Sequence, residues 1–350
     1  MTILLYVLIA ATLVALVLYA IEKSRRRTYP VTGGLHESIS LPHTHSVELY
    51  SNSFSHCSRK ARFVVAELGL EVKHHSIDLI ETGWYQTISK EYLKVNRAGL
   101  VPTLVHNGHP VYESDDILAY AQTIARADAP QLVPHDPALK AKMDEWLSFC
   151  AIVSADIFGG MKERAGACIP GLSFVMFMAA IRYIPLRNII PGFLYHSNKK
   201  SPILFSSFKI FGIRGMAKQK RVREMMHTSR DHMMTHLQTL NRTLELNGNS
   251  WILGETFSLA DITIGCMLLR LEETGWLHWF ERSGDIQNVI DYYARIKARP
   301  AWAEAITARA HPIVEQAKMD LIQIRSNDPA LSELIYGPVA SIKISEKEAA

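Results

Sequence analysis

The chain has 350 residues, of which 48% are hydrophobic and 21% are charged. This length and composition predict about two folded domains and exclude a disordered or low-complexity protein. The formal charge of +4 is too small to indicate a nucleic-acid-binding protein. The cysteines are too far apart for a Cys-x-x-Cys zinc site and too few for a disulfide framework: Cys57, Cys150, Cys168 and Cys266. We therefore expect reduced thiols, no metal and no nucleic-acid partner.

Residues 2–21, TILLYVLIAATLVALVLYAI, form an uncharged apolar stretch. A helix of this length spans roughly 30 Å, the thickness of the hydrocarbon core of a bilayer. Only Met1 precedes the stretch, whereas Lys23 and three arginines at 25–27 follow it. A cleavable signal peptide has the opposite order, with positive charge first. We expect residues 1–27 to be a single-pass membrane anchor, with a signal peptide as the alternative.

The positive-inside rule then places everything after the anchor in the cytoplasm. Residues 28–46 are rich in Pro, Gly, His and Ser and show no hydrophobic periodicity. Such composition is typical of a linker, so we expect these residues to tether a soluble domain to the membrane.

Residues 47–127 alternate predicted strands with predicted helices. Hydrophobic patterning predicts strands at 47–50, 72–78, 100–105 and 109–112, and helices at 57–68 and 116–125. Asn107-Gly108 is a strong signal for a two-residue hairpin turn between the last two strands. The order β-α-β followed by β-β-α predicts an α/β, thioredoxin-like domain.

Three features of this domain could carry chemistry. Cys57 stands where a helix begins, and the free N–H groups and dipole there stabilise a thiolate; an inert buried cysteine is the alternative. Val101-Pro102 begins a strand, and a cis bond would let the backbone pair with an extended peptide; an ordinary trans proline is the alternative. Glu113-Ser114 precedes a helix whose start suits a carboxylate ligand, with simple capping as the alternative.

Residues 138–318 are predicted to form an all-helical domain, followed by a tail at 319–350. Ser258 and Asp261 have the spacing of a capping box, which indicates a helix start rather than chemistry. His232 and His236 are four residues apart on a predicted helix. No His-Glu-x-x-His pattern joins them, so we expect solvated or core positions rather than a metal site.

Residues 165–216 are expected to be an insertion in this domain. Their apolar run is broken by Pro170-Gly171 and by Arg182 and is too short to span a bilayer. Basic residues are scattered through the segment. We favour an interfacial segment that dips into the lipid headgroups, with a lid over a substrate pocket as the alternative.

Taken together, the motifs resemble the glutathione transferase superfamily. They are Ser-x-Cys-Ser at 55–58, Asn-x-Ala-Gly-x-Val-Pro-Thr-Leu at 96–104, Glu-Ser-Asp-Asp-Ile at 113–117 and Ser-x-Ala-Asp at 258–261. The pattern Cys57-Ser58-x-Lys60-x-Arg62 is most similar to the tetrachlorohydroquinone dehalogenases. Zeta-class members, which are also similar, carry a further serine where this chain has His56.

The resemblance implies glutathione as co-substrate. Val101, beside Pro102, would pair with its cysteinyl backbone, and Glu113 and Ser114 would bind its γ-glutamyl end. The resemblance also implies Cys57, Ser55 or Ser58 as the catalytic group. Members of the family commonly form homodimers, so the resemblance implies a possible homodimer, with an anchored monomer as the alternative.

These implications lead to one main hypothesis and two alternatives. The main one is a membrane-anchored glutathione S-transferase that transfers glutathione to a hydrophobic electrophile, or uses it to reduce one through a mixed disulfide at Cys57. The first alternative is a non-catalytic, membrane-associated interaction protein of the same fold, in contact with lipid. The second, a general disulfide oxidoreductase, ranks last because Cys57 has no Cys-x-x-Cys partner.

Overall fold

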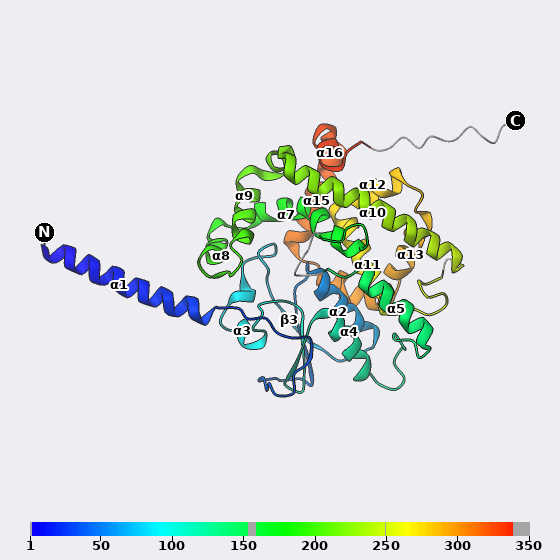
Figure 1. Cartoon of the computed structure of the whole chain (residues 1–350), viewed down its shortest axis with the longest axis horizontal. Coiled ribbons are helices and arrows are strands. Elements are labelled where there is room, and N and C mark those ends of the chain that lie inside the picture. The colour runs from blue at the N-terminus through cyan, green and yellow to red at the C-terminus, as the bar shows by residue number, and fades with distance from the viewer. Residues whose placement is uncertain (1, 153–158, 249, 339–350) are drawn as a thin grey trace.

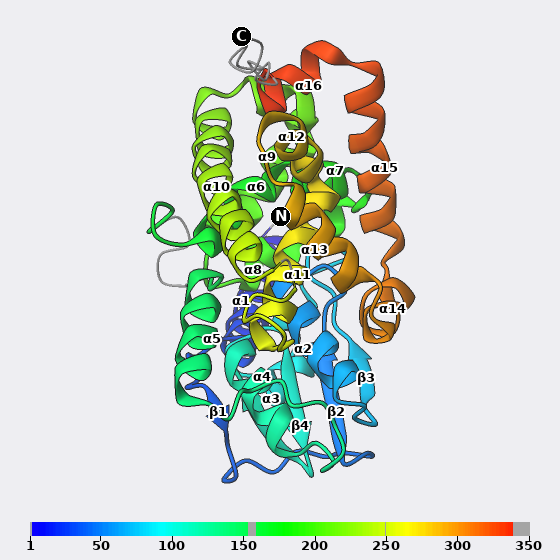
Figure 2. The same cartoon turned by 90° about the vertical axis from the view of Figure 1, so that its right-hand side faces the viewer.

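The computed structural model describes residues 2–152, 159–248 and 250–338. The long N-terminal helix α1 (Thr2–Arg25) projects away from a body made of an α/β domain and a helical domain (Figure 1). Figure 2 shows the helical domain stacked on the α/β domain, with the sheet at the far end from α16. The predicted combination of a thioredoxin-like α/β domain and a mostly helical domain is confirmed.

The α/β domain is built on a five-stranded mixed sheet with strand order β1-β5-β4-β2-β3. Its strands are β1 (Gly34–Leu35), β2 (Val47–Ser51), β3 (Lys73–Ser76), β4 (Thr103–His106) and β5 (His109–Tyr112). β2 and β3 are parallel and the other pairs are antiparallel. The helices are α2 (His56–Glu67), α3 (Tyr92–Val95) and α4 (Ser114–Thr123). The predicted element order is confirmed, although β3 and β4 are shorter than expected.

The segment at 28–46, which the sequence predicts to be a free linker, is packed against this sheet. β1 lies within it and pairs with β5 through Gly34 and Tyr112. Further on, the Leu41 N–H donates to the Gly108 carbonyl at 2.8 Å, and the Tyr29 N–H donates to the Arg97 carbonyl at 2.8 Å. Without β1, β5 would be an edge strand with unpaired backbone groups, and the segment satisfies them. The connection between α1 and the domain is therefore an ordered part of the fold.

The helical domain surrounds α11 (Leu259–Thr274), almost all of whose residues are buried. The remaining helices are α5 (Pro137–Phe149), α6 (Ile169–Leu172), α7 (Phe174–Ala180), α8 (Ile190–Tyr195), α9 (Lys200–Lys218), α10 (Lys220–Leu246), α12 (Trp276–Ser283), α13 (Gln287–Lys297), α14 (Pro300–Ala305), α15 (Pro312–Asn327) and α16 (Pro329–Tyr336). Hydrophobic periodicity predicts a helix over 136–153. The structure ends it as α5 at Phe149, and residue 153 lies outside the described residues. The region predicted as a tail contains most of α15 and all of α16.

The start of α11 contains the capping box that the sequence predicts. The Asp261 carboxylate accepts hydrogen bonds from the backbone N–H of Ser258 at 2.8 Å and of Ile252 at 2.9 Å. It also accepts one from the Tyr292 hydroxyl at 2.8 Å. These partners satisfy a carboxylate that is fully buried, and they link α11 to α13.

A buried ion pair joins α2 to α11 and so connects the two domains. The two terminal nitrogens of Arg59 donate to the two carboxylate oxygens of Glu273, at 2.7 and 2.6 Å. Both side chains are about 95% removed from solvent. Arg62 adds a second link, because its Nε donates to the Ala305 carbonyl of α14 at 2.8 Å. These contacts hold α2, the helix that carries Cys57, in a fixed position against the helical domain.

Two segments among the described residues are long and apolar enough to cross a membrane. Ile3–Arg25 has a mean hydropathy of 2.7 and is entirely exposed, while Ala165–Tyr183 has a mean hydropathy of 1.6 and is 78% buried. Burial shows that the second segment is part of the protein core. The first passes the same test as an anchor or a signal sequence would, so length and composition do not separate the two.

The structure corrects the expectation for residues 165–216 in part. Ala165, Val175 and Met178 are fully buried, so the first third of the segment is core rather than an interfacial membrane segment. The apolar residues that face solvent lie further along, in and around α8 and along α9. All the basic residues of the segment lie in the second part, from Arg182 onwards, whereas residues 165–181 contain none.

Candidate functional site

The loop before α2 is fixed by a buried amide that the sequence did not single out. The Asn52 side-chain oxygen accepts from the N–H groups of Phe54 and Ser55, at 2.8 and 2.9 Å. Its amide nitrogen donates to the Ile77 carbonyl at 2.9 Å and to the Thr82 hydroxyl at 2.8 Å. Asn52 therefore ties the loop to the end of β3 and holds the first turn of α2 in place.

The first turn of α2 carries the predicted serine and cysteine. Ser55 is the N-cap, and its hydroxyl oxygen accepts from the Ser58 N–H at 3.3 Å. This bond leaves the hydroxyl hydrogen of Ser55 free to donate to another group. Cys57 is the second residue of the helix and is partly exposed, whereas the other three cysteines are buried. The thiol therefore lies at the positive end of the helix dipole and within reach of a ligand.

Ser58 is placed differently from the other two candidates. Its side chain is fully buried, and its hydroxyl accepts from the Asn52 N–H at 3.1 Å. It does not line either of the cavities next to Cys57. Its position supports the loop and offers no contact with a ligand.

A cavity of about 160 Å³ brings the other predicted ligand-binding residues together around Cys57. Its walls include Val101 and Pro102 from the start of β4, and Glu113 and Ser114 from the start of α4. The Val101-Pro102 peptide bond is cis. We call this space the polar cavity, because backbone groups, a helix N-terminus and charged side chains line it.

The two backbone segments of the polar cavity have local supports. Tyr92 and Asn96 hold the turn before Val101, because the Tyr92 hydroxyl and the Asn96 amide both donate to the Leu100 carbonyl, at 2.5 and 3.1 Å. Glu113 has a φ of 62°, in the left-handed region that non-glycine residues seldom adopt. Such strain at the start of a helix is a common feature of ligand sites.

A buried lysine, Lys60, and a half-exposed aspartate, Asp115, form an ion pair in the wall of the polar cavity. The Lys60 Nζ lies 2.5 Å from an Asp115 carboxylate oxygen, and the lysine side chain is only 3% exposed. Burial opposes the charge of Lys60, but Asp115, together with the nearby Cys57 sulfur, outweighs it and raises its pKa. A cation is therefore retained one turn of α2 away from the Cys57 thiol. The sequence could not predict this pair, because its two partners lie 55 positions apart.

His56 contributes a neutral ring between the polar cavity and the apolar cavity described next. Burial, together with the positive charges of Lys60, Arg270 and Arg59, holds its pKa well below the usual range. Neither ring nitrogen has a hydrogen-bond partner of good geometry among the described residues. A ring held neutral in this way is a weak proton acceptor, so its surroundings do not favour a role as a base.

A second cavity, of about 760 Å³, opens on the other side of Cys57. We call it the apolar cavity, because most of its wall is hydrocarbon: Phe54, Leu79, Ile152, Ile169, Pro170, Phe174, Phe177, Ile203, Leu204, Phe205 and Met216. Ser55, His56 and Cys57 line it as well. Cys57, His56 and Ile152 border both cavities. The thiol therefore stands at the junction between a polar space and an apolar one.

Three charged side chains also line the apolar cavity: Lys200 and two that the sequence did not single out, Glu81 and Arg270. Burial raises the pKa of Glu81 to about 7, against the opposing effect of Arg270. Arg270 lies with its guanidinium 3.6 Å from the centroid of the Phe54 ring and donates to the Phe54 carbonyl. No local motif marks either residue, because both depend on contacts between distant segments.

Residues of the insertion form part of the apolar cavity wall. Ser201, Leu204 and Phe205 of α9 line it, and the Tyr85 hydroxyl lies 3.3 Å from the Ser201 hydroxyl. The second half of the insertion therefore covers this cavity, which agrees with the lid that the sequence left as an alternative.

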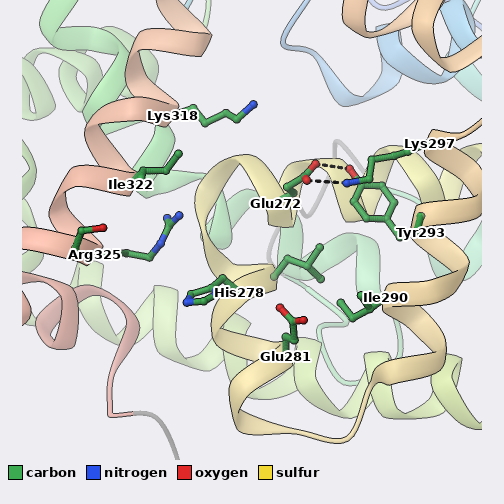
Figure 3. Close-up of a pocket in the computed structure, with 12 residues that line it drawn as sticks. Glu272, His278, Glu281, Ile290, Tyr293, Lys297, Lys318, Ile322 and Arg325 are labelled. Carbon is green, nitrogen blue, oxygen red and sulfur yellow. Dashed lines mark hydrogen bonds and ion pairs between the residues drawn. The ribbon is translucent and has the colours of Figure 1, made fainter.

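A groove of about 600 Å³ lies elsewhere on the helical domain, between α11–α13 and α15 (Figure 3). In it the Glu272 carboxylate accepts from the Tyr293 hydroxyl at 2.7 Å and from Lys297 at 2.9 Å (Figure 3). None of the predicted site residues lines this groove.

Over residues 2–152, 159–248 and 250–338, no group of three or more His, Cys, Asp or Glu side chains could hold a metal ion. His236 instead approaches the Met161 carbonyl at 2.7 Å.

Comparisons with known proteins indicate the family to which the chain is similar. Residues 54–124 match the family model for the N-terminal domain of glutathione S-transferases, and residues 210–308 match the model for the C-terminal domain. Glutathione S-transferase D7 of Drosophila melanogaster is 30% identical over 105 residues, which cover 30% of this chain and 45% of that protein.

Two further similarities extend over most of the chain. The tetrachloro-p-hydroquinone reductive dehalogenase of Sphingobium chlorophenolicum is 23% identical over 270 residues, which cover 76% of this chain and 96% of that protein. The crystal structure of the beta-etherase LigF from Sphingobium sp. strain SYK-6 superposes with a TM-score of 0.60 at 20% identity, covering 75% of this chain and all of that one. With both domain models matched in order and the same fold in LigF, the chain belongs to the glutathione transferase superfamily.

Proposed function

We propose that this protein is a membrane-anchored glutathione transferase that acts on a hydrophobic electrophile. The observation that carries the proposal is the position of Cys57 and Ser55 beside the apolar cavity, with Cys57 also bordering the polar cavity. Glutathione is a charged, peptide-like molecule and suits the polar cavity, whereas the large hydrocarbon-lined cavity suits an apolar co-substrate. The reacting sulfur would then lie between the two.

In the polar cavity, the backbone of Val101 would pair with the cysteinyl part of glutathione. Glu113 would hold the γ-glutamyl amino group, and the Ser114 N–H groups at the start of α4 would hold its carboxylate. Lys60 adds a buried cation to the same cavity, which suits a co-substrate with two carboxylates. Ser58, which touches neither cavity, has no part in this proposal.

Two reaction routes are open at the junction. In conjugation, the Ser55 hydroxyl donates to the glutathione thiolate, whose sulfur attacks the electrophile while the leaving group departs with the bonding electrons. In reduction, the Cys57 thiolate then attacks the glutathionyl sulfur of the conjugate. The displaced carbon takes up a proton, a Cys57–glutathione disulfide remains, and a second glutathione regenerates the thiol as oxidised glutathione forms. The reductive dehalogenase among the relatives supports the second route.

The anchor is the second part of the proposal. We infer that α1 is an uncleaved single-pass anchor, with the folded domains in the cytoplasm and in contact with lipid. Its support is the exposed apolar surface of α1, the basic residues that follow it, and its contacts with the body of the protein through Tyr19. The Tyr19 hydroxyl donates to the Leu194 carbonyl of α8 at 3.1 Å. A helix that is removed as a signal peptide would have no use for such a contact.

Glutathione binding and turnover of the detergent-solubilised full chain test the proposal. We expect saturable binding of glutathione by calorimetry, conjugation of chlorodinitrobenzene, and loss of binding in Glu113→Ala. Asp144→Ala, which removes an exposed carboxylate on α5, serves as the matched control. Absence of both binding and turnover in the wild type would overturn the proposal and leave the non-catalytic alternative.

The anchor is tested by the intact mass of the mature chain. A cleaved signal peptide would lower that mass, whereas an uncleaved anchor leaves the mass of the full chain.

A further inference from the structure

An unusual group of exposed apolar side chains surrounds α8, close to the end of α1. Leu186, Ile190, Phe193 and Leu194 are between 38% and 59% exposed, and we call this group the α8 surface. Figure 1 shows α8 next to the point where α1 joins the body. Large apolar side chains gathered in one place on a protein surface indicate an interaction site.

The α8 surface is held rigidly, so it is not a loosely packed loop. A Cβ atom on Gly192 would come within 2.4 Å of the Tyr85 ring, which shows how closely α8 packs against the α/β domain. The Asn188 amide donates to the Gly83 carbonyl at 3.0 Å. These contacts leave the apolar side chains of the α8 surface directed away from the packed side.

Contacts with α1 set the depth of the α8 surface relative to a bilayer. Tyr19, two residues before the end of the apolar stretch, donates to the Leu194 carbonyl at 3.1 Å, and its ring lies 6.0 Å from that of Tyr195. The Arg26 guanidinium lies 4.8 Å from the centroid of the Tyr195 ring. If the apolar stretch of α1 spans the hydrocarbon core, α8 lies at the level where that core ends and the headgroups begin.

Positive charge surrounds the same end of α1. An open groove of about 900 Å³ there is lined by five basic side chains, Arg25, Arg27, Lys90, Lys94 and Arg97. Only Glu91 among the lining residues is acidic. A basic groove beside an apolar surface complements a membrane with anionic headgroups.

The residues at the opening of the apolar cavity, which we call its rim, adjoin the α8 surface. Asn198 and Lys200 follow α8 directly, and both line the cavity. Ile203 of α9 also lines it while remaining 56% exposed. The opening of the cavity therefore lies within a few residues of the α8 surface.

From this arrangement we propose that the α8 surface is seated in the headgroup region of an anionic bilayer, and that the electrophile enters the apolar cavity from the lipid phase. The occupant of the surface is the membrane that holds α1. The substrate class is a lipid-dissolved electrophile, and this second part rests on the proposed transferase function.

Membrane seating is tested without any need for activity. Spin labels are attached at Phe193→Cys, and separately at Leu246→Cys, in a full-length Cys57→Ser background, where the three remaining cysteines are buried. Leu246 is an apolar control at the end of α10 and is 80% exposed. The chain is reconstituted in vesicles of phosphatidylcholine with a minority of phosphatidylserine, and relaxation is measured with oxygen and with a water-soluble nickel complex.

We expect the label at 193 to be accessible to oxygen and protected from nickel, and the label at 246 to show the reverse. Equal access of nickel to both positions would overturn the proposal, because the α8 surface would then face water. Protection of position 193 from both reagents would also overturn it, since a second copy or another protein would then cover the surface.

The entry route is tested by kinetics. The double variant Ile190→Asp and Phe193→Asp changes two residues that line neither cavity. Its turnover of water-soluble chlorodinitrobenzene should be unchanged. Turnover of a long-chain alkyl analogue dissolved in the vesicles should fall by about tenfold or more, because charged side chains withdraw the rim from the headgroups.

Leu246→Asp is the matched control and should leave both rates unchanged. Equal rates of the double variant and the wild type on the long-chain analogue would overturn the entry route. Failure of the transferase function itself would show as no turnover of either substrate by the wild type, and the spin-label result would still decide the membrane seating.

Discussion

The ion pair between Arg59 and Glu273 offers a quantitative test of how the two domains are held together. The perturbation is Glu273→Gln, which keeps the size of the side chain but removes its charge. The two hydrogen bonds are 2.7 and 2.6 Å long, and both side chains are about 95% buried, so solvent screens them little. Removing one partner of such a pair leaves a buried, uncompensated charge, which costs about 3–5 kcal/mol.

The amide of glutamine can still accept one of the two hydrogen bonds, so we expect a loss at the lower end, about 3 kcal/mol. For a chain of this size, with about 2.1 cal/mol/K of unfolding entropy per residue, that corresponds to a fall in Tm of roughly 4–5 °C. The assay is thermal and urea unfolding of the detergent-solubilised full chain at neutral pH. Asp144→Asn is the control, because its pair with Lys140 is about half exposed on each side and should contribute less than about 1 kcal/mol.

A second variant separates the charge from the packing. In Arg59→Met combined with Glu273→Leu, apolar side chains replace both charges, and part of the lost stability should return. The return is incomplete because Arg270, whose Nε lies 3.6 Å from a Glu273 carboxylate oxygen, then loses its buried partner. If Glu273→Gln destabilised the protein no more than Asp144→Asn, the pair would not be holding α2 against the helical domain, and the reasoning would be refuted.

Three further perturbations follow from the same contacts. Burial raises the pKa of Glu81 to about 7, so the folded state loses stability as pH rises from about 4.5 to 7. Glu81→Gln should be more stable than the wild type by about 2–3 kcal/mol at pH 8 and equally stable at pH 4. A stability difference in urea unfolding that stays constant across pH would contradict this. Burial alone would raise the pKa of Glu48, but hydrogen bonds from the N–H groups of Thr44 and His45 and from the His75 ring outweigh it and lower that pKa to about 2. The wild type should therefore be more stable than Glu48→Gln at neutral pH, and this difference should disappear between about pH 4.5 and 2. An undiminished difference at pH 2 would contradict the prediction. Ser55→Ala should lower the free energy of unfolding by about 1 kcal/mol, because the N-cap is lost. Ser55→Asp should retain most of that stability, since aspartate also caps helices. Equal losses of stability in the two variants would refute a capping role.

The parts of the site that could be predicted from the sequence are those in which function is tied to a local backbone feature. Cys57 follows an N-cap serine, Val101-Pro102 directly precedes a strand, and Glu113-Ser114 marks the start of a helix. Each of these signals lies within a few residues along the chain. For this reason the sequence alone could predict the main residues that line the polar cavity.

The remaining contacts depend on residues that are far apart in the sequence. Lys60 pairs with Asp115, and Glu81 and Arg270 meet in one cavity from different domains. The pairing of β1 with β5 was missed because a strand of two residues has no periodicity to detect. The insertion was only partly understood because burial of Val175 and Met178, and exposure of Ile190, follow from packing rather than from composition.

The central claim is that Cys57 is a reactive thiol in a working glutathione site, and intact mass spectrometry tests it most directly. The detergent-purified full chain is incubated with oxidised glutathione, beside Cys57→Ala and a control, Cys266→Ala, which removes a fully buried thiol. We predict one glutathione adduct on the wild type and on the control, and none on Cys57→Ala. An unmodified wild type, or an adduct that persists in Cys57→Ala, would contradict the claim.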